Sequence, residues 1–396
     1  KLYINDSGTV KEIGGGGGVT SDAQQNTIAG TNAGSSFSGT DPEDNTLFGY
    51  DAGAAITTGD DNTFIGSNAG KANTTGWENV AIGYNALKVN TTGSNHTAIG
   101  RNALDANTTG DGNIAIGQNA LSSNTTATYN TAVGGLALTT ATTGGYNTAI
   151  GREALRFTTT GDYNIAIGWE ALRSNTTATR NVAIGRGSSR TLSGTAAERN
   201  TSVGSESLYS TTTGYMNSAF GDSSLFANTT GNVNTGLGYR ALYDSTTGSN
   251  NVAIGGFALK ANTTGNNSCS IGYEALNGNT TGGSNNAFGM SALHDVSTGS
   301  YNIGIGRNAG DEITTGDNNI LIGYNSEASS ATVSNEITLG DTNITKFRVP
   351  GLNFSIKDST ATDNYVLTVD ANGDAGWEAA AGGGTSTGET YVLLKD

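Results

Sequence analysis

The sequence contains one cysteine, two prolines and two histidines among its 396 residues. The single cysteine, Cys269, excludes a disulfide framework and a cysteine-based metal site within one chain. Two prolines are too few for a collagen-like chain or a proline-rich linker. His96 and His294 lie far apart in the sequence and form no ligand cluster, so we expect no metal site, no catalytic site and no cofactor.

Apolar and basic residues are also scarce. Hydrophobic residues make up 35% of the chain, below the roughly 45–50% of globular domains, which favours a narrow or shared core over a thick one. No run approaches 18 apolar residues, so no membrane-spanning helix is expected. The net charge of −15 argues against nucleic acid or an anionic membrane as a partner. The chain starts at Lys1 rather than Met, and we expect a processed product or a fragment.

Glycine is abundant instead, and it marks a repeat of 17 residues. One copy, residues 79–95, reads NVAIGYNALKVNTTGSN. Its glycine recurs, with one step of 19 residues, at positions 49, 66, 83, 100, 117, 134, 151, 168, 185, 204, 221, 238, 255, 272, 289, 306, 323 and 340. A constant short period predicts a solenoid or fibre, in which each repeat contacts only its neighbours. Such proteins are surfaces, spacers or scaffolds more often than enzymes.

Apolar residues alternate just before this repeat glycine. The residue before it is large and apolar in all eighteen copies, and a β-branched residue stands two positions earlier in most of them. A spacing of two places both residues on one side of a short strand. We therefore predict a structural core stripe that consists of Ile65, Ile82, Ile99, Ile116, Ile150, Ile167, Ile184, Ile254, Ile271, Ile305 and Ile322.

The rest of the repeat predicts a second apolar stripe, an asparagine ladder and a turn. Leucine stands four residues after the glycine in twelve copies. We assign the second stripe to Leu87, Leu104, Leu121, Leu155, Leu172 and Leu259. Asparagine stands four residues before the glycine in fifteen copies, and stacked coils would align these side chains into a hydrogen-bonded ladder. The ladder comprises Asn62, Asn79, Asn113, Asn130, Asn147 and Asn164. An Asn-Thr-Thr-Gly segment is typical of a tight turn.

These features predict an all-β fold, a parallel β-roll or β-helix solenoid of 17-residue coils. Seventeen residues are too few for a strand–helix unit with loops, and the apolar pattern has a period of two. Coils that rise about 4.8 Å each would form a rod on the order of 85 Å long. Two large apolar residues per coil make a thin core, so we expect chains to associate as a parallel homotrimeric fibre. The sequence leaves open which apolar stripe would lie between the chains.

Four segments follow from the limits of the repeat. Residues 1–20 predict a short β module and a glycine linker, and residues 21–45 a lead-in coil. Residues 46–345 form the β-solenoid shaft of about eighteen coils, and residues 346–396 a C-terminal β module and a glycine-rich joint. Both end modules are too small to be stable alone, so we expect other chains to order them and to join the rods end to end.

Three further motifs allow more than one interpretation. Asn-Thr-Thr matches the N-glycosylation sequon at Asn73, Asn90, Asn107 and Asn124, but turn chemistry explains the same motif and is favoured. Aspartate-containing turns offer oxygen ligands to calcium, yet they lack the strict spacing of calcium-binding β-rolls. Regular threonines are a feature of ice-binding surfaces, but here they lie in a turn rather than in a flat strand.

Aromatic residues follow the repeat glycine directly in several copies. Packing between coils explains them, and a strip that binds a cell-surface glycan is the alternative. The residues are Tyr84, Trp169, Tyr239, Tyr273 and Tyr324. A polysaccharide-degrading spike would need a carboxylate pair in a groove. We recognise no such pair in the repeat, and so we expect no enzyme.

The Asn-x-Ala-Ile-Gly coils resemble the head repeats of YadA-type trimeric autotransporter adhesins. The longer unit, with Ala-Leu and Asn-Thr-Thr-Gly, is similar to repeats in tail-fibre proteins of aquatic bacteriophages. The segment 335–351 resembles the exit from such repeats. This resemblance implies parallel β-rolls that trimerise. We recognise neither a membrane-anchor barrel nor a self-cleaving chaperone domain, so the resemblance implies a fibre shaft.

We therefore expect a structural or adhesive fibre shaft of a phage tail fibre, located on a virion or an extracellular surface and involved in host-surface attachment. The alternative is a bacterial extracellular filament or adhesin that is glycosylated and assembles through its terminal strands. Expected partners are further copies of the chain and a cell-surface glycan, without nucleic acid or membrane insertion. The stripe assignment predicts that Ile167→Asp is among the most damaging single changes and that Thr160→Asp is nearly silent.

Overall fold

The computed structural model describes residues 3–4, 10–11, 20–37, 42–346, 365–369 and 375–379. These residues form β-strands and turns, and none of them lies in a helix that could span a membrane. The strands are β1 (Tyr3–Ile4), β2 (Val10–Lys11), β3 (Thr20–Ser21), β4 (Thr27–Ala29), β5 (Thr46–Phe48), β6 (Thr63–Ile65), β7 (Val80–Ile82), β8 (Thr97–Ile99), β9 (Ile114–Ile116), β10 (Thr131–Val133), β11 (Thr148–Ile150), β12 (Ile165–Ile167), β13 (Val182–Ile184), β14 (Thr201–Val203), β15 (Ser218–Phe220), β16 (Thr235–Leu237), β17 (Val252–Ile254), β18 (Cys269–Ile271), β19 (Asn286–Phe288), β20 (Ile303–Ile305), β21 (Ile320–Ile322), β22 (Ile337–Leu339), β23 (Tyr365–Val369) and β24 (Ala375–Ala379).

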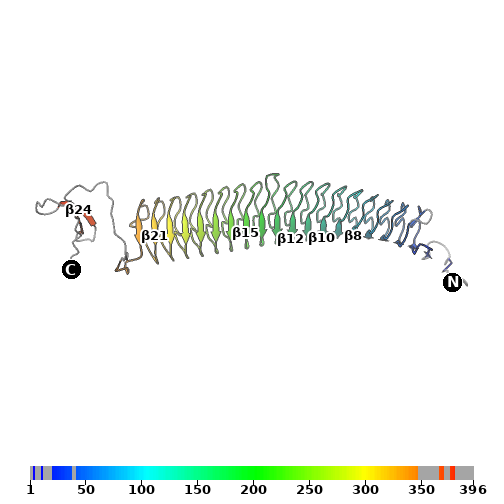
Figure 1. Ribbon diagram of the computed structural model, residues 1–396, viewed down its shortest axis with the longest axis horizontal. Helices are drawn as coiled ribbons and strands as arrows, with labels where there is room; N and C mark the ends of the chain where they lie inside the picture. The colour runs from blue at the N-terminus through cyan, green and yellow to red at the C-terminus, as the bar shows by residue number, and fades with distance from the viewer. Residues whose placement is uncertain are drawn as a thin grey trace, which may run out of the picture. The chain divides into compact units, whose positions relative to one another are not determined.

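Strands β4–β22 form one parallel sheet with a single strand per coil, which confirms the predicted β-solenoid. Each strand pairs with the equivalent residues of the next coil, as when Ala115 pairs with Ala98 and with Ala132. The strands succeed one another along a rod (Figure 1). Nineteen strands with a spacing of about 4.8 Å give this stack a length of roughly 85 Å.

The lead-in segment contributes a coil of its own. Strand β4 pairs in parallel with β5 at an offset of 19 residues, and Gly30 takes the place of the repeat glycine with a φ of +130°. Strand β3 runs antiparallel to β4. Each of the two end modules contains an antiparallel strand pair, β1 with β2 and β23 with β24. The second hairpin belongs to a separate unit, Ile344–Asp396, and the solenoid belongs to the unit Lys1–Asn343.

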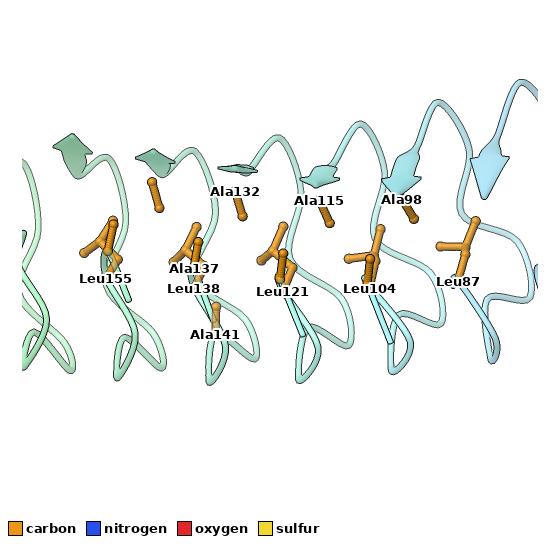
Figure 2. Close-up of a cluster of buried hydrophobic side chains, with 14 of the residues drawn as sticks. Leu87, Ala98, Leu104, Ala115, Leu121, Ala132, Ala137, Leu138, Ala141 and Leu155 are labelled. Atoms are coloured by element: carbon orange, nitrogen blue, oxygen red, sulfur yellow. The ribbon is translucent and has the colours of Figure 1, made fainter. Parts of the chain in front are cut away.

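Alanine and leucine fill the inside of the coil. The middle residue of each three-residue strand points inward and is usually alanine, such as Ala115 and Ala132 (Figure 2). Opposite it lies the second stripe, where Leu121 and its counterparts are fully buried. Leu87, Leu104, Leu121, Leu155, Leu172 and Leu259 all have 0% of their surface exposed. The strand and the leucine segment therefore lie close together, with space for only a methyl group on the strand.

The leucines occupy a backbone conformation that glycine prefers. Leu87 has a φ of +53° and Leu172 a φ of +49°, in the left-handed region that non-glycine residues seldom adopt. Burial of the side chain offsets this strain. In the coils of Leu47 and Phe64, whose strands carry a large residue inside, Gly53 and Gly70 replace the leucine. A Cβ on Gly70 would lie 2.3 Å from the ring of Phe64.

The predicted core stripe of isoleucines lies on the outer side of the strands, so its assignment to the coil interior is wrong. Ile65, Ile150, Ile184, Ile271, Ile305 and Ile322 are exposed, and Ile82, Ile99, Ile116, Ile167 and Ile254 are half-buried. The physical reason is space. The middle residue of each strand faces the second stripe across a narrow gap. Alanine fits into this gap in most coils, whereas an isoleucine opposite a leucine would not. We call the row of eighteen apolar residues before the repeat glycines the outer stripe.

The apolar core is interrupted where the repeat has its 19-residue step. One buried cluster runs from Leu47 to Ala197 and a second from Leu208 to Leu321. Four buried serines form a hydrogen-bonded group at this step: the hydroxyl of Ser202 lies 2.6 Å from that of Ser188 and 2.8 Å from that of Ser189, and Ser188 lies 3.1 Å from Ser207. The hydrogen bonds satisfy these hydroxyls without water, and the sheet continues in register from β13 to β14.

Candidate functional surfaces

The asparagine ladder forms at the start of each strand, and its side chains are buried. The Oδ1 atom of Asn130 accepts a hydrogen bond from the backbone N–H of Asn147 at 2.9 Å, and Asn147 does the same for Asn164. The Nδ2 atom of Asn147 donates to the carbonyl of Gly161 at 2.8 Å. Asn62, Asn79 and Asn113 make equivalent bonds. The ladder is therefore structural, since its polar atoms hold neighbouring coils in register.

The sequon asparagines form a second buried ladder. Asn73, Asn90, Asn107 and Asn124 have 0% of their surface exposed. The Nδ2 atom of Asn90 donates to Oδ1 of Asn73 at 2.6 Å and to the carbonyl of Gly93 at 2.8 Å. A sugar on Nδ2 would replace these bonds and has no room inside the coil. The folded coil therefore contradicts the glycosylation hypothesis and agrees with the turn interpretation.

His96 replaces asparagine in the first ladder. Its Nδ1 atom accepts the backbone N–H of Asn113 at 3.1 Å, and its ring also bonds to the carbonyl of Gly110. Because Nδ1 accepts a backbone N–H, the hydrogen of the neutral ring is assigned to Nε2, which lies 3.1 Å from Nδ2 of Asn107. Burial of the ring lowers the pKa of His96 from 6.5 to about 4. The imidazole is therefore neutral at physiological pH and acts as a substitute for the asparagine.

We expect His96 to make the solenoid sensitive to acid. The unfolded chain protonates this imidazole near pH 6.5 and the folded chain only near pH 4. The free energy of unfolding is therefore highest above pH 6.5. It decreases by about 3 kcal/mol as the pH falls toward 4, because the unfolded chain takes up a proton at His96 and the folded chain does not. Urea unfolding of the wild type and of His96→Asn at pH 7.5 and pH 4.5 tests this. A stability gap that is equal at both pH values would contradict it.

The aromatic residues after the repeat glycine stay on the surface. Tyr84, Trp169, Tyr239, Tyr273 and Tyr324 are all exposed, so packing between coils does not account for them fully. Phe257 makes edge contacts with Tyr239 and Tyr273, with ring centroids 5.2 and 5.9 Å away.

Two further aromatic stacks were missed in the sequence. They comprise Tyr129–Tyr146–Tyr163 and Tyr209–Phe226–Tyr243, with centroids 5.0 to 5.3 Å apart. The signal was present, because each stack occupies one repeat position in three successive coils.

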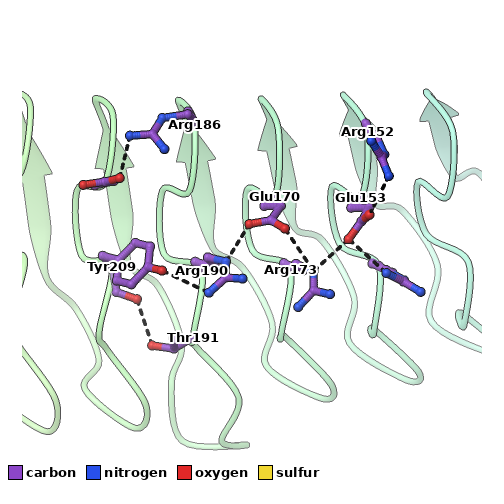
Figure 3. A network of polar contacts seen from close by, with 10 residues as sticks. Arg152, Glu153, Glu170, Arg173, Arg186, Arg190, Thr191 and Tyr209 are labelled. Atoms are coloured by element: carbon purple, nitrogen blue, oxygen red, sulfur yellow. Dashed lines mark hydrogen bonds and ion pairs between the residues drawn. The ribbon is translucent and has the colours of Figure 1, made fainter.

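Arginine and glutamate form an ion-pair ladder across four coils (Figure 3). Glu153 accepts hydrogen bonds from Arg156 and Arg173, both at 2.9 Å, and Glu170 accepts one from Arg190 at 2.7 Å. The hydrogen bond from Arg173 is the main reason why the pKa of Glu153 is below its ordinary value. Glu153 and Glu170 share one repeat position, a carboxylate pair missed in the sequence. Their oxygens are engaged by arginine, which favours a structural role over acid–base chemistry.

The described residues contain no group of three or more histidine, cysteine, aspartate or glutamate side chains placed to hold a metal ion. Glu327 occupies the position of the leucine stripe near the end of the solenoid. Its burial, and a hydrogen bond to Asp311, raise the pKa of Glu327 to about 8. Cys269 lies on the outer side of β18, two residues before Ile271 of the outer stripe, and is partly exposed.

Comparison of the chain with protein-family models, with curated proteins and with solved structures gives no match.

Proposed function

We propose that the chain is the shaft of a self-associating fibre, a parallel homotrimer, that serves as a phage tail fibre in attachment to a host surface. The observation that carries this proposal is the outer stripe. Eighteen consecutive coils each place a large apolar residue on the outside of the sheet, from Phe48 to Leu339. Alanine and leucine already fill the interior of each coil, so the outer row is not needed for the core of a single chain. We infer that it packs against other copies of the chain.

The size of the stripe fits an interface. Its exposed members, such as Ile65 and Phe48, show 37% to 55% of their surface to solvent. Together the eleven exposed and seven half-buried side chains of the stripe make an apolar strip on the order of 1,000 Å² per chain, which exceeds the largest patches of ordinary monomers and suits a stable interface. Three copies around a common axis would remove all three strips from water.

We expect the native protein to sediment as a particle of about 120 kDa, three times the 40.0 kDa of one chain. Cys269 provides a second measurement, because parallel copies in register would bring their Cys269 side chains to the same level beside the buried stripe. A short bis-maleimide should therefore cross-link the chains, and Cys269→Ser should abolish the cross-link without a change in mass.

A particle of one or two chains in dilute buffer would refute the trimer. A trimer without the cross-link would refute the in-register arrangement and leave the association itself intact. Genes for virion proteins beside this one would support the tail fibre, and a secretion signal or anchor in the complete gene would instead support the bacterial filament.

A further inference from the structure

Trp169 lies between two arginines on neighbouring coils. It directly follows the repeat glycine Gly168, and Arg152 and Arg186 occupy the same position on the preceding and following coils. The pairing of β11 with β12 and of β12 with β13 aligns the three residues across the sheet. They span about 10 Å along the rod. Trp169 is 47% exposed, and the side chains of Arg152 and Arg186 are 71% and 55% exposed.

The charges around Trp169 are layered, with the positive charge outermost. Eight of the eleven arginines lie between positions 152 and 240 of a chain whose net charge is −15. The carboxylates of Glu153 and Glu170 lie beneath the arginines, with only 9% and 16% of their side chains exposed. Arg152 pairs with Glu153 at 3.5 Å, and Arg186 pairs with Glu206. One such contact occupies one or two of the five N–H donors of a guanidinium group, so further donors remain for a ligand.

We propose that Trp169, Arg152 and Arg186 bind a segment of an anionic polysaccharide, with a sugar ring on the indole and a carboxylate at each arginine. The electropositive C–H groups of a pyranose ring suit the negative face of an aromatic ring. The planar fork of a guanidinium group suits the two oxygens of a carboxylate. This inference deepens the attachment role proposed above and rests on that role for its biological setting, but not on the trimer.

A carboxylated polysaccharide fits this surface better than nucleic acid or a membrane. Only a short basic stretch interrupts the acidic chain, so a ligand longer than this stretch meets repulsion in proportion to its charge density. Duplex nucleic acid, with one charge per about 1.7 Å of axis, is therefore disfavoured more than a polysaccharide with at most one carboxylate per sugar ring. The three residues lie in a row along the stack of coils, which suits an extended polymer. Ion pairs of Arg173 with Glu153 and of Arg190 with Glu170 connect the neighbouring coils beside this row.

Affinity electrophoresis of the full chain in native gels that contain polygalacturonate tests the proposal. We expect the polymer to slow the wild type, whereas neutral dextran should not. Trp169→Ala and the double variant Arg152→Gln, Arg186→Gln should each weaken the retardation at least about tenfold. Trp77→Ala is the matched control: Trp77 is also 47% exposed, but its counterparts on the neighbouring coils are Asp60 and Ser94. It should behave like the wild type.

Several results would overturn the inference. The first is that polygalacturonate does not slow the wild type, and the second is that it slows Trp169→Ala as much as the wild type. The third is that duplex DNA or anionic phospholipid vesicles slow the wild type as strongly as polygalacturonate does. The last result would indicate general attraction of polyanions. Sedimentation of the same samples tests the self-associating fibre independently, because the mass of the particle depends on association between chains and not on polysaccharide binding.

Discussion

Leu172→Asp should unfold the middle of the solenoid. Leu172 is fully buried, in line with Leu155 of the preceding coil. Truncation of such a leucine to alanine costs about 2–5 kcal/mol, and a carboxylate in its place adds the penalty of a buried charge without a partner. We therefore expect a loss of more than about 4 kcal/mol. Because each coil is supported only by its neighbours, the defect should spread along the array. Urea unfolding followed by circular dichroism measures the loss.

Ile167→Asp in the same coil is the matched comparison. Ile167 lies on the outer stripe and is half-buried, so the new carboxylate would remain hydrated in a single chain. Under dilute conditions that give monomers, we expect a loss below about 1 kcal/mol. At higher concentration the same change should weaken association, because it places charges inside the proposed interface. Thr160→Asp, in an exposed turn, should be silent in both assays. Equal damage from Leu172→Asp and Ile167→Asp in monomers would contradict the assigned sides of the strand.

Gly168→Ala should destabilise the solenoid nearly as much as Leu172→Asp, because the added methyl group would collide with the backbone of the next coil. Gly168 has a φ of +133°, and a Cβ there would lie 2.5 Å from the carbonyl oxygen of Gly185 on the next coil. The added methyl group meets backbone atoms, which cannot move without breaking the pairing of β12 with β13. Strain and overpacking together predict a loss of roughly 3 kcal/mol or more. Thermal melting followed by circular dichroism should show a clear decrease in the melting temperature.

Gly135→Ala is the control for this change. Gly135 directly follows a repeat glycine, and a Cβ at this position would meet no atom within 4 Å. Since alanine reduces the freedom of the unfolded chain, we expect no loss and a gain of up to about 1 kcal/mol. Equal melting temperatures of Gly168→Ala and Gly135→Ala would contradict the close backbone contact between successive repeat glycines.

The repeat by itself determined the length of each coil, the position of its strand and the register of the sheet. Successive coils carry equivalent residues 17 positions apart, and in-register pairing, such as Thr131 with Thr148, places equal residues beside each other. The repeat also located the leucine stripe, but its full burial within a single chain came from the structure. The aromatic stacks and the pair of Glu153 and Glu170 were recoverable in the same way, by alignment of equal positions in successive coils.

Only the tertiary structure decided which side of each strand faces inward. A period of two separates the sides of a strand but does not orient them, and the larger side chains of Ile82 or Ile167 favoured the wrong choice. The left-handed backbone at Leu87 and Leu172 turns these leucines into the coil, and the space that remains admits only residues such as Ala81 and Ala166. The asparagine of each Asn-Thr-Thr segment is buried for a similar reason, since its amide donates to a carbonyl of the turn inside the coil. Turn geometry, which a linear pattern does not contain, thus set both the core of the coil and the surface that it offers to partners.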